Sequence, residues 1–257
     1  MIRIAVPDGS IGNNPSSGIA VIDYVYLNKM IEKEFEKDNI KVEWHFFKGA
    51  GPAINEALVN KQIDFAFIGD LGAIIGRSNQ LDSKLLMAIA RQIYGYLAVQ
   101  PNQGYTNLEA LKGKSIAVYH GTASQLSFDQ VLDHYGFTEK DFRIINLDYA
   151  AANAALVAKK IDAAWGNSGL LALQQRGIVD IPISSHNTGS SLGTTQMGLI
   201  ADAQIIQQYP DFVQRVVNTV LKSSYWVAQA QNRNAAIEMV SENANYPVQL
   251  YALSFKD

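Results

Sequence analysis

The chain has 257 residues, of which 48% are hydrophobic and 18% are charged, so it can bury a substantial core without a metal or a disulfide. Its formal net charge is −3 and it has no basic run, which argues against a nucleic-acid partner and against a polybasic membrane surface. The absence of cysteine excludes disulfides, thiolate metal sites and cysteine nucleophiles.

The first predicted element is a strand over residues 1–6, followed by a long loop with glycines over 7–18. Apolar residues at helical spacing predict a helix over 27–35, and alternating apolar and polar residues predict a strand over 41–46. The opening strand lacks the basic start, apolar run and small-residue cleavage site of a secretory leader. Two expectations stay open: a cytosolic protein, or a mature extracytoplasmic form with a replacement Met1.

Strands and helices alternate through the rest of the chain. Further strands are predicted over 65–68, 85–90, 96–99 and 115–119, and helices after 51, after a capping box at Thr106 and Glu109, up to Gly136, and over 210–231 and 234–242. No stretch approaches the ~18 apolar residues of a membrane span. This alternation predicts an α/β protein with largely parallel sheets.

Residues 57–66 are echoed by residues 155–164. Seven identities keep a constant offset of 98 positions, and in both copies a helix ends, a turn carries lysine and a strand starts with aspartate. Each copy then enters a polar glycine loop, at 69–72 and at 166–169. Chance agreement among common residues is one explanation. The other is two lobes of the same topology, each presenting a loop at the carboxyl end of a strand, where open α/β sheets bind ligands.

Two loops have the composition of an anion site. In the segment 118–124, a strand leads through Gly121 into a helix that starts with Thr122 and Ser124, and free N–H groups at a helix start favour anions. An ordinary N-cap, the alternative reading, needs only one hydroxyl. The loop 47–52 is similar but does not match the phosphate-binding pattern GxxxxGK[ST], so nucleotide binding is not expected.

Catalytic or metal-binding patterns are not found in the sequence. None of the four histidines has metal-ligand spacing and there is no GxSxG elbow, so we expect neither an enzyme nor a metal or cofactor. Asp70, at the end of a buried strand, could either cap the next helix or accept a ligand amine. Trp165, Tyr94 and Tyr96 could wall a ligand, although aromatic residues at strand ends more often belong to the core edge.

Several segments resemble one protein family. Residues 51–58 and 63–70 resemble the "GP…EAL…IDF…GD" segment of the aliphatic-sulfonate, taurine and nitrate solute-binding proteins of ABC transporters. Residues 111–124, 155–163 and 209–213 resemble further segments of that family, in the right order and over nearly the whole chain.

The resemblance implies a type II periplasmic-binding-protein fold. Two similar three-layer α/β lobes would be joined by two crossover strands, near 94–100 and 192–200. Lobe 1 would comprise 1–95 and 196–257, and lobe 2 would comprise 96–195. By resemblance the ligand is held by loop residues of both lobes, namely Ser10, Lys48, Gly49, Ala50, Gly69, Asp70, Leu71, Gly121, Thr122, Ala123, Ser124, Trp165, Asn167, Thr194 and Thr195.

The function implied by the resemblance is that of an extracytoplasmic solute-binding receptor of an ABC importer. It would be a periplasmic or lipid-anchored extracellular monomer that traps a small anion, such as a sulfonate, between two closing lobes and presents it to a permease. The first loop, 8–15, is longer than expected and leaves the ligand open. Alternatives on the same scaffold are a ligand-sensing domain and an enzyme like the thiamin-pyrimidine synthases, whose cysteine-rich motif cannot occur here.

Overall fold

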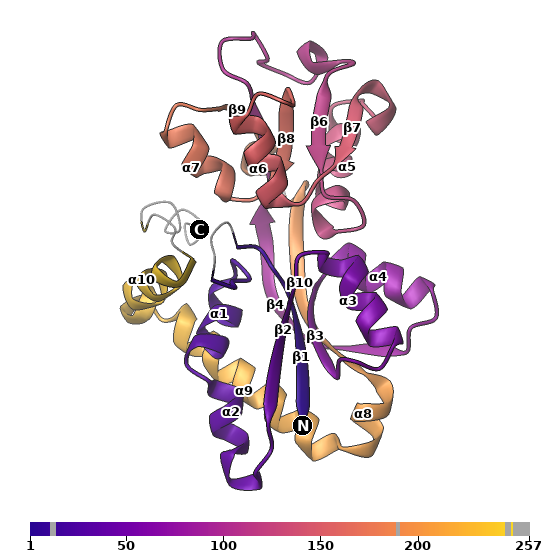
Figure 1. The fold of residues 1–257 in the computed structure, drawn as a ribbon, viewed down its shortest axis with the longest axis vertical. Coiled ribbons are helices and arrows are strands. Elements are labelled where there is room, and N and C mark those ends of the chain that lie inside the picture. Colours follow the sequence, from indigo (N-terminus) through magenta and orange to yellow (C-terminus); the bar gives the residue numbers. More distant parts are fainter. Residues whose placement is uncertain (11–13, 189–190, 245–247, 249–257) are drawn as a thin grey trace. The chain divides into compact units, whose positions relative to one another are not determined.

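The computed structural model describes residues 1–10, 14–188, 191–244 and 248, and the chain forms two compact units (Figure 1). Unit 1 comprises Met1–Ala90 and Gln196–Val248, and unit 2 comprises Arg91–Thr195. The chain passes between the units within the long strand β4 (Ser83–Tyr94) and near the start of β10 (Thr194–Asp202).

The sheet of unit 1 has the strand order β2-β1-β3-β10-β4. Its remaining strands are β1 (Ile2–Pro7), β2 (Val42–Phe47) and β3 (Phe65–Gly69). Strand β1 is parallel to β2 and β3, whereas β10 is antiparallel to β3. The expectation of largely parallel strands therefore holds for β1–β3. Strand β10, which follows the return of the chain from unit 2, is an antiparallel exception.

Helices cover both faces of this sheet (Figure 1). They are α1 (Ala20–Leu27), α2 (Met30–Phe35), α3 (Ala50–Val59), α4 (Asp70–Ser78), α8 (Ala203–Gln208) and α9 (Pro210–Ala228). Helix α10 (Arg233–Ala244) packs on α1 and α9, and short 3-10 turns lie at Glu36–Asp38 and Ala230–Asn232. Successive strand residues face opposite layers: Ile4 packs with α1, α2 and α9, whereas Ala5 packs with α3. The helix predicted over 27–35 is two helices, because Lys29 is left-handed at φ 53°.

The sheet of unit 2 has the order β7-β6-β8-β5-β9, which matches that of unit 1 position by position. Its strands are β5 (Tyr96–Val99), β6 (Ser115–Val118), β7 (Arg143–Asn146), β8 (Ala163–Gly166) and β9 (Asp180–Ser184). Strand β6 is parallel to β7 and β8, and β5 is antiparallel to β8. Both sheets therefore have three parallel strands followed by an antiparallel one.

Helix α5 packs on one face of the unit 2 sheet, and α6 and α7 pack on the other. Their bounds are Ala123–His134, Tyr149–Val157 and Gly169–Gln175, and the 3-10 turns are Glu109–Leu111, Glu139–Asp141 and Ser185–Thr188. The capping box predicted at Thr106 is wrong: Asn107 Oδ1 accepts the N–H of Ala110 at 3.0 Å instead. Among the helices that the structure describes, none combines the length and apolarity needed to cross a bilayer.

Candidate functional site

The predicted ligand residues of unit 1 follow the carboxyl ends of its three parallel strands. Ser10 comes after β1 and 48–50 come after β2, whereas 69–71 start with the last residue of β3. Pro7 of β1 is paired with Phe47 of β2, so these strands end at the same edge of the sheet. This is the edge at which open α/β sheets bind ligands. Residues 11–13 of the long first loop lie outside the described residues.

The described part of the first loop is held by a buried aspartate that sequence reasoning missed. Ser10 donates its N–H to Asp8 Oδ1 at 2.9 Å. Asp23 of α1 is fully buried and accepts the hydroxyl of Ser16 at 2.6 Å and the N–H of Ser17 at 2.8 Å. Burial raises the pKa of Asp23. The only sequence signal was a carboxylate in the otherwise apolar run 19–27.

Asp70 is the first residue of α4 and not its N-cap, which is Gly69, although the Asp70 side chain accepts an N–H group of the first turn. Its Oδ1 accepts the N–H of Leu71 at 2.8 Å, and its carboxylate also accepts the backbone N–H of Gln196. Burial raises the pKa of Asp70. Since two backbone donors already face this carboxylate, contact with a ligand amine stays a prediction.

The loop after β2 requires glycine where it enters α3. Lys48 and Gly49 are exposed, and Ala50 begins α3 in a left-handed conformation at φ 45°. A Cβ added to Gly49 would lie 2.6 Å from the Cβ of Ala53, so the start of this helix requires glycine at that position.

The clearest arrangement for an anion is the loop between β6 and α5. Gly121 is left-handed at φ 70°, and Thr122 Oγ1 donates to Tyr119 O at 2.6 Å and accepts the N–H of Ser124 at 3.2 Å. Thr122 is therefore an N-cap, as the alternative reading required. Among the described residues, the N–H groups of Thr122 and Ala123 have no hydrogen-bond partner. Two free donors at a helix start favour a negative group.

The second predicted loop of unit 2 follows β8. Asn167 Oδ1 accepts the N–H of Gly169 at 2.9 Å and so supports the start of α7. The Trp165 side chain is only 2% exposed, and its Nε1 donates to Ser127 Oγ at 3.2 Å. The indole thus belongs to the core of unit 2, and its contact with a ligand stays a prediction.

Thr194 and Thr195 lie at the start of β10. Thr194 is buried and its hydroxyl donates to Ser191 O, whereas Thr195 is half-buried. Their role in ligand binding also stays a prediction.

A polar cluster next to the Gly121 loop was missed by sequence reasoning. Gly121 N–H donates to Gln125 Oε1 at 2.8 Å, and Gln125 Nε2 donates to Glu139 Oε1 at 3.2 Å. His120 Nε2 lies 3.6 Å from the same carboxylate. Burial, followed by the charge and hydrogen bond of Glu139, raises the pKa of Asp129 to about 6. No sequence pattern predicts that Gln125 and Asp129 of α5 contact Glu139, so this cluster could not be recognised before the structure was known.

Metal ligation finds no support in the described ranges, where no group of three or more histidine, aspartate or glutamate side chains is placed to hold an ion. The groups that could contact a ligand are therefore backbone N–H groups, hydroxyls, amides and the exposed Lys48.

Residues 34–234 match the model of the family described as "NMT1/THI5 like". The putative aliphatic sulfonates-binding protein of Bacillus subtilis (strain 168) is 29% identical over 216 residues, which are 82% of this chain. The chain spans 62% of that curated relative, less than two thirds of its length.

Solved structures of similar proteins confirm the predicted fold class. The putative periplasmic sulfonate-binding protein SsuA of Methylobacillus flagellatus KT is 30% identical with a TM-score of 0.81, covering 99% of this chain and 77% of that one. The alkanesulfonate-binding protein SsuA of Xanthomonas axonopodis pv. citri, bound to MOPS, is 20% identical with a TM-score of 0.83, covering 98% and 82%. The second likeness is one of fold alone.

Proposed function

The chain belongs to the NMT1/THI5-like family, and from this premise we propose that it is the solute-binding receptor of an ABC importer for a small sulfonate or similar compact anion. The observation that carries the proposal is the pair of free N–H groups at Thr122 and Ala123, at the start of α5. The names of the Bacillus subtilis and Methylobacillus flagellatus relatives describe sulfonate-binding proteins, which supports the same ligand class.

One helix start cannot supply the whole affinity. A charge near a helix terminus is stabilised by ~0.3–2 kcal/mol, whereas micromolar binding requires about 8 kcal/mol. We therefore propose that the loops of unit 1, including Ser10, Lys48 and Gly69, contact the same ligand. A ligand that binds one arrangement of the units better than another shifts the population toward it, which is the physical basis of trapping.

The partner in this proposal is the permease of the importer, which would read the ligand-bound state. A periplasmic or lipid-anchored extracellular location follows from the same role. The similar structures include a periplasmic sulfonate-binding protein, which supports a location outside the cytoplasm.

Isothermal titration of the full chain with ethanesulfonate, taurine, nitrate and methylphosphonate tests the proposal. We expect saturable heat with at least one sulfonate and none with an uncharged pyrimidine. Heat with the pyrimidine alone would contradict an anion receptor. Mass spectrometry of the ligand after prolonged incubation separates a receptor from an enzyme, since a receptor returns its ligand unchanged.

A further inference from the structure

One amide side chain connects the Gly121 loop to the turn at Glu139. Gln125 Oε1 accepts the Gly121 N–H at 2.8 Å while its Nε2 donates to Glu139 Oε1 at 3.2 Å. A backbone N–H requires an oxygen and a carboxylate requires an N–H, so both neighbours select the same orientation of the amide. Gly121, to which Gln125 is bonded, is left-handed and lies directly before the free N–H groups of Thr122 and Ala123.

The carboxyl groups of Asp129 and Glu139 interact next to the Gln125 amide. Asp129 lies one helical turn after Gln125 and is hydrogen-bonded to Glu139, and His120 Nε2 approaches Glu139 Oε1 to 3.6 Å while its ring nitrogen is buried without a hydrogen-bond partner in the described structure. The charged groups that act on Asp129 are Glu139, which favours its protonated form, and His120, which opposes it. Burial adds to the effect of Glu139, and the pKa of Asp129 is raised to about 6.

We propose that Gln125 and Glu139 are positioning residues of the anion loop, and that a proton shared by Asp129 and Glu139 strengthens anion binding there. The inference rests on the proposed function and names a regulation of the same site. The shared proton joins the two carboxyl groups and keeps Glu139 where Gln125 requires it. It also removes a negative charge near the loop.

Loss of the proton has the opposite effect. Two ionised carboxylates repel each other, so Glu139 is displaced from Gln125 and the alignment of the Gly121 loop weakens. The added charge also opposes an incoming anion. An anion is therefore expected to bind more tightly as the pH falls through about 6, with uptake of a proton.

The first test is isothermal titration of the full chain with ethanesulfonate at pH values of about 5.5 and 8. A sulfonate keeps its charge over this range, so any pH dependence belongs to the protein. Wild type should bind about fivefold more tightly at the lower pH, the lower end of typical coupling between sites. Asp129→Asn should bind at the low-pH affinity at both values, since its amide donates to Glu139 without titrating. Asp133→Asn, an exposed position on the same helix, is the matched control and should keep the wild-type profile.

Two further variants separate alignment from charge. Gln125→Met keeps the side-chain length but deletes both hydrogen bonds, so we expect weaker binding at both pH values. Glu139→Gln keeps an acceptor for Gln125 but removes the charge, so binding should stay strong and lose its pH dependence. The proposal would be overturned if Gln125→Met had the wild-type anion affinity at both pH values, or if the affinity of Asp129→Asn depended on pH as that of wild type does.

A readout without ligand separates this proposal from the proposed function. The amide resonance of Gly121 should titrate with a midpoint near 6 in wild type and stay constant in Asp129→Asn. A constant Gly121 resonance in wild type would overturn the positioning role whatever the ligand is. Absence of heat with every anion, together with a titrating Gly121, would instead overturn the proposed function alone.

Discussion

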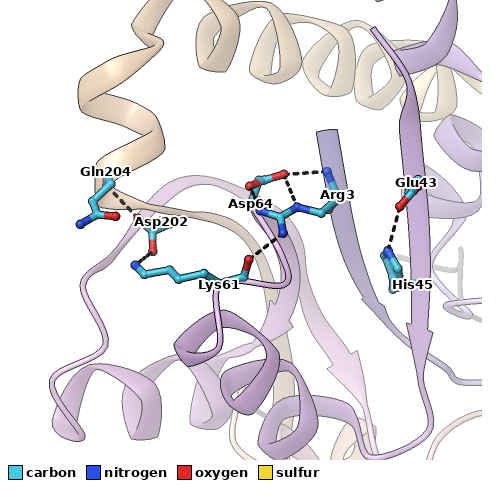
Figure 2. Close-up of polar contacts among 7 residues, drawn as sticks. All are labelled: Arg3, Glu43, His45, Lys61, Asp64, Asp202 and Gln204. Atoms are coloured by element: carbon cyan, nitrogen blue, oxygen red, sulfur yellow. Dashed lines mark hydrogen bonds and ion pairs between the residues drawn. The ribbon is translucent and has the colours of Figure 1, made fainter. Parts of the chain in front are cut away.

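Asp64 and Asp162 make the same hydrogen bond in two different sheets. Asp64 Oδ2 accepts the backbone N–H of Arg3 at 2.8 Å, and Asp162 Oδ2 accepts that of Ser115 at 2.9 Å (Figure 2 shows the first pair). Each aspartate also donates its own N–H to the carbonyl oxygen of the same partner, at 2.9 and 3.1 Å. The carboxylates thus fix the pairing of the first parallel strand with the third in both units, and the sequence repeat is a structural repeat.

Replacing Asp162 by Asn should destabilise the protein most at neutral pH. Burial opposes ionisation of Asp162, but hydrogen bonds from Ser115 and Tyr105 and the charge of Lys114 lower its pKa below 3.8. A lowered pKa stabilises the fold above the unfolded value and loses that effect as the pH falls through the folded value. We expect Asp162→Asn to lower the free energy of unfolding by about 1–2 kcal/mol at pH 7. In urea titrations the difference should shrink below about pH 3.8; a difference that grows there would contradict this assignment.

Replacing Ala123 by Pro should remove one ligand donor without disturbing the helix. Proline at the first helical position breaks no intrahelical bond, and Thr122 already has the extended conformation that a residue before proline requires, at φ −113° and ψ 166°. A hydrogen bond to a charged group contributes about 1.5–3 kcal/mol, so anion affinity should fall about tenfold or more. Titration calorimetry measures the loss, and circular dichroism verifies the fold. Ala123→Ser, which keeps the N–H, should bind like wild type; equal binding by the proline variant would show that this N–H does not face the ligand.

The repeat could be predicted from the sequence because its residues have local geometric roles. Lys61 and Lys159 are both left-handed at φ 55°, and each follows the end of a helix that packs on the sheet. The aspartates three residues later pair with backbone of another strand. Because the turn and the start of the strand have the same geometry in both units, the same residue types occur at the same spacing in both segments. The α/β class and the presence of two similar lobes could therefore be predicted from short-range pattern, whereas the strand orders are known only from the structure.

The side-chain arrangement of the candidate site could not be predicted in the same way. Trp165 lies at a strand end next to a predicted ligand loop, but strand alternation does not tell which neighbours will cover a given face, and α5 covers the indole. Asp23 and Glu139 accept hydrogen bonds from Ser16 and Gln125, which lie 7 and 14 positions earlier in the sequence and come into contact with them only after folding. Residue type and spacing contain no information on such pairings.

Gly95 and Trp165 should show strong energetic coupling. A Cβ at Gly95 would overlap the six-membered ring of the Trp165 indole. Gly95 does not have a positive φ, so this overlap, not backbone strain, excludes alanine. Overpacking of this kind costs about 1–3 kcal/mol. We expect Gly95→Ala to lower the free energy of unfolding by that amount, measured by urea titration with circular dichroism.

The double variant decides whether the indole is the cause. Phenylalanine at position 165 lacks the fused second ring of the indole, and with it the outer atoms that a Cβ at Gly95 would overlap. The loss of unfolding free energy caused by Gly95→Ala should therefore be smaller in a Trp165→Phe background, by about 1 kcal/mol or more. Trp165→Phe alone should cost about 1 kcal/mol, because its hydrogen bond to Ser127 is lost. Equal costs of Gly95→Ala in both backgrounds would mean that another contact excludes the methyl group.

Replacing Asp129 by Asn should stabilise the protein at alkaline pH. The pKa of Asp129 is raised from 3.8 to about 6, so the folded state holds a proton that the unfolded state has released between these values. Stability therefore falls as the pH rises from about 4 to 6, and the full penalty is present above 6. One pKa unit corresponds to about 1.4 kcal/mol, and because the carboxyl group is partly exposed, screening leaves roughly 1 kcal/mol in all. Urea titrations should show Asp129→Asn more stable than wild type by this amount at about pH 8 and equal to it at about pH 4. Asp133→Asn should show no such pH dependence, and an advantage of Asp129→Asn that is largest at pH 4 would reverse the sign and refute the shared proton.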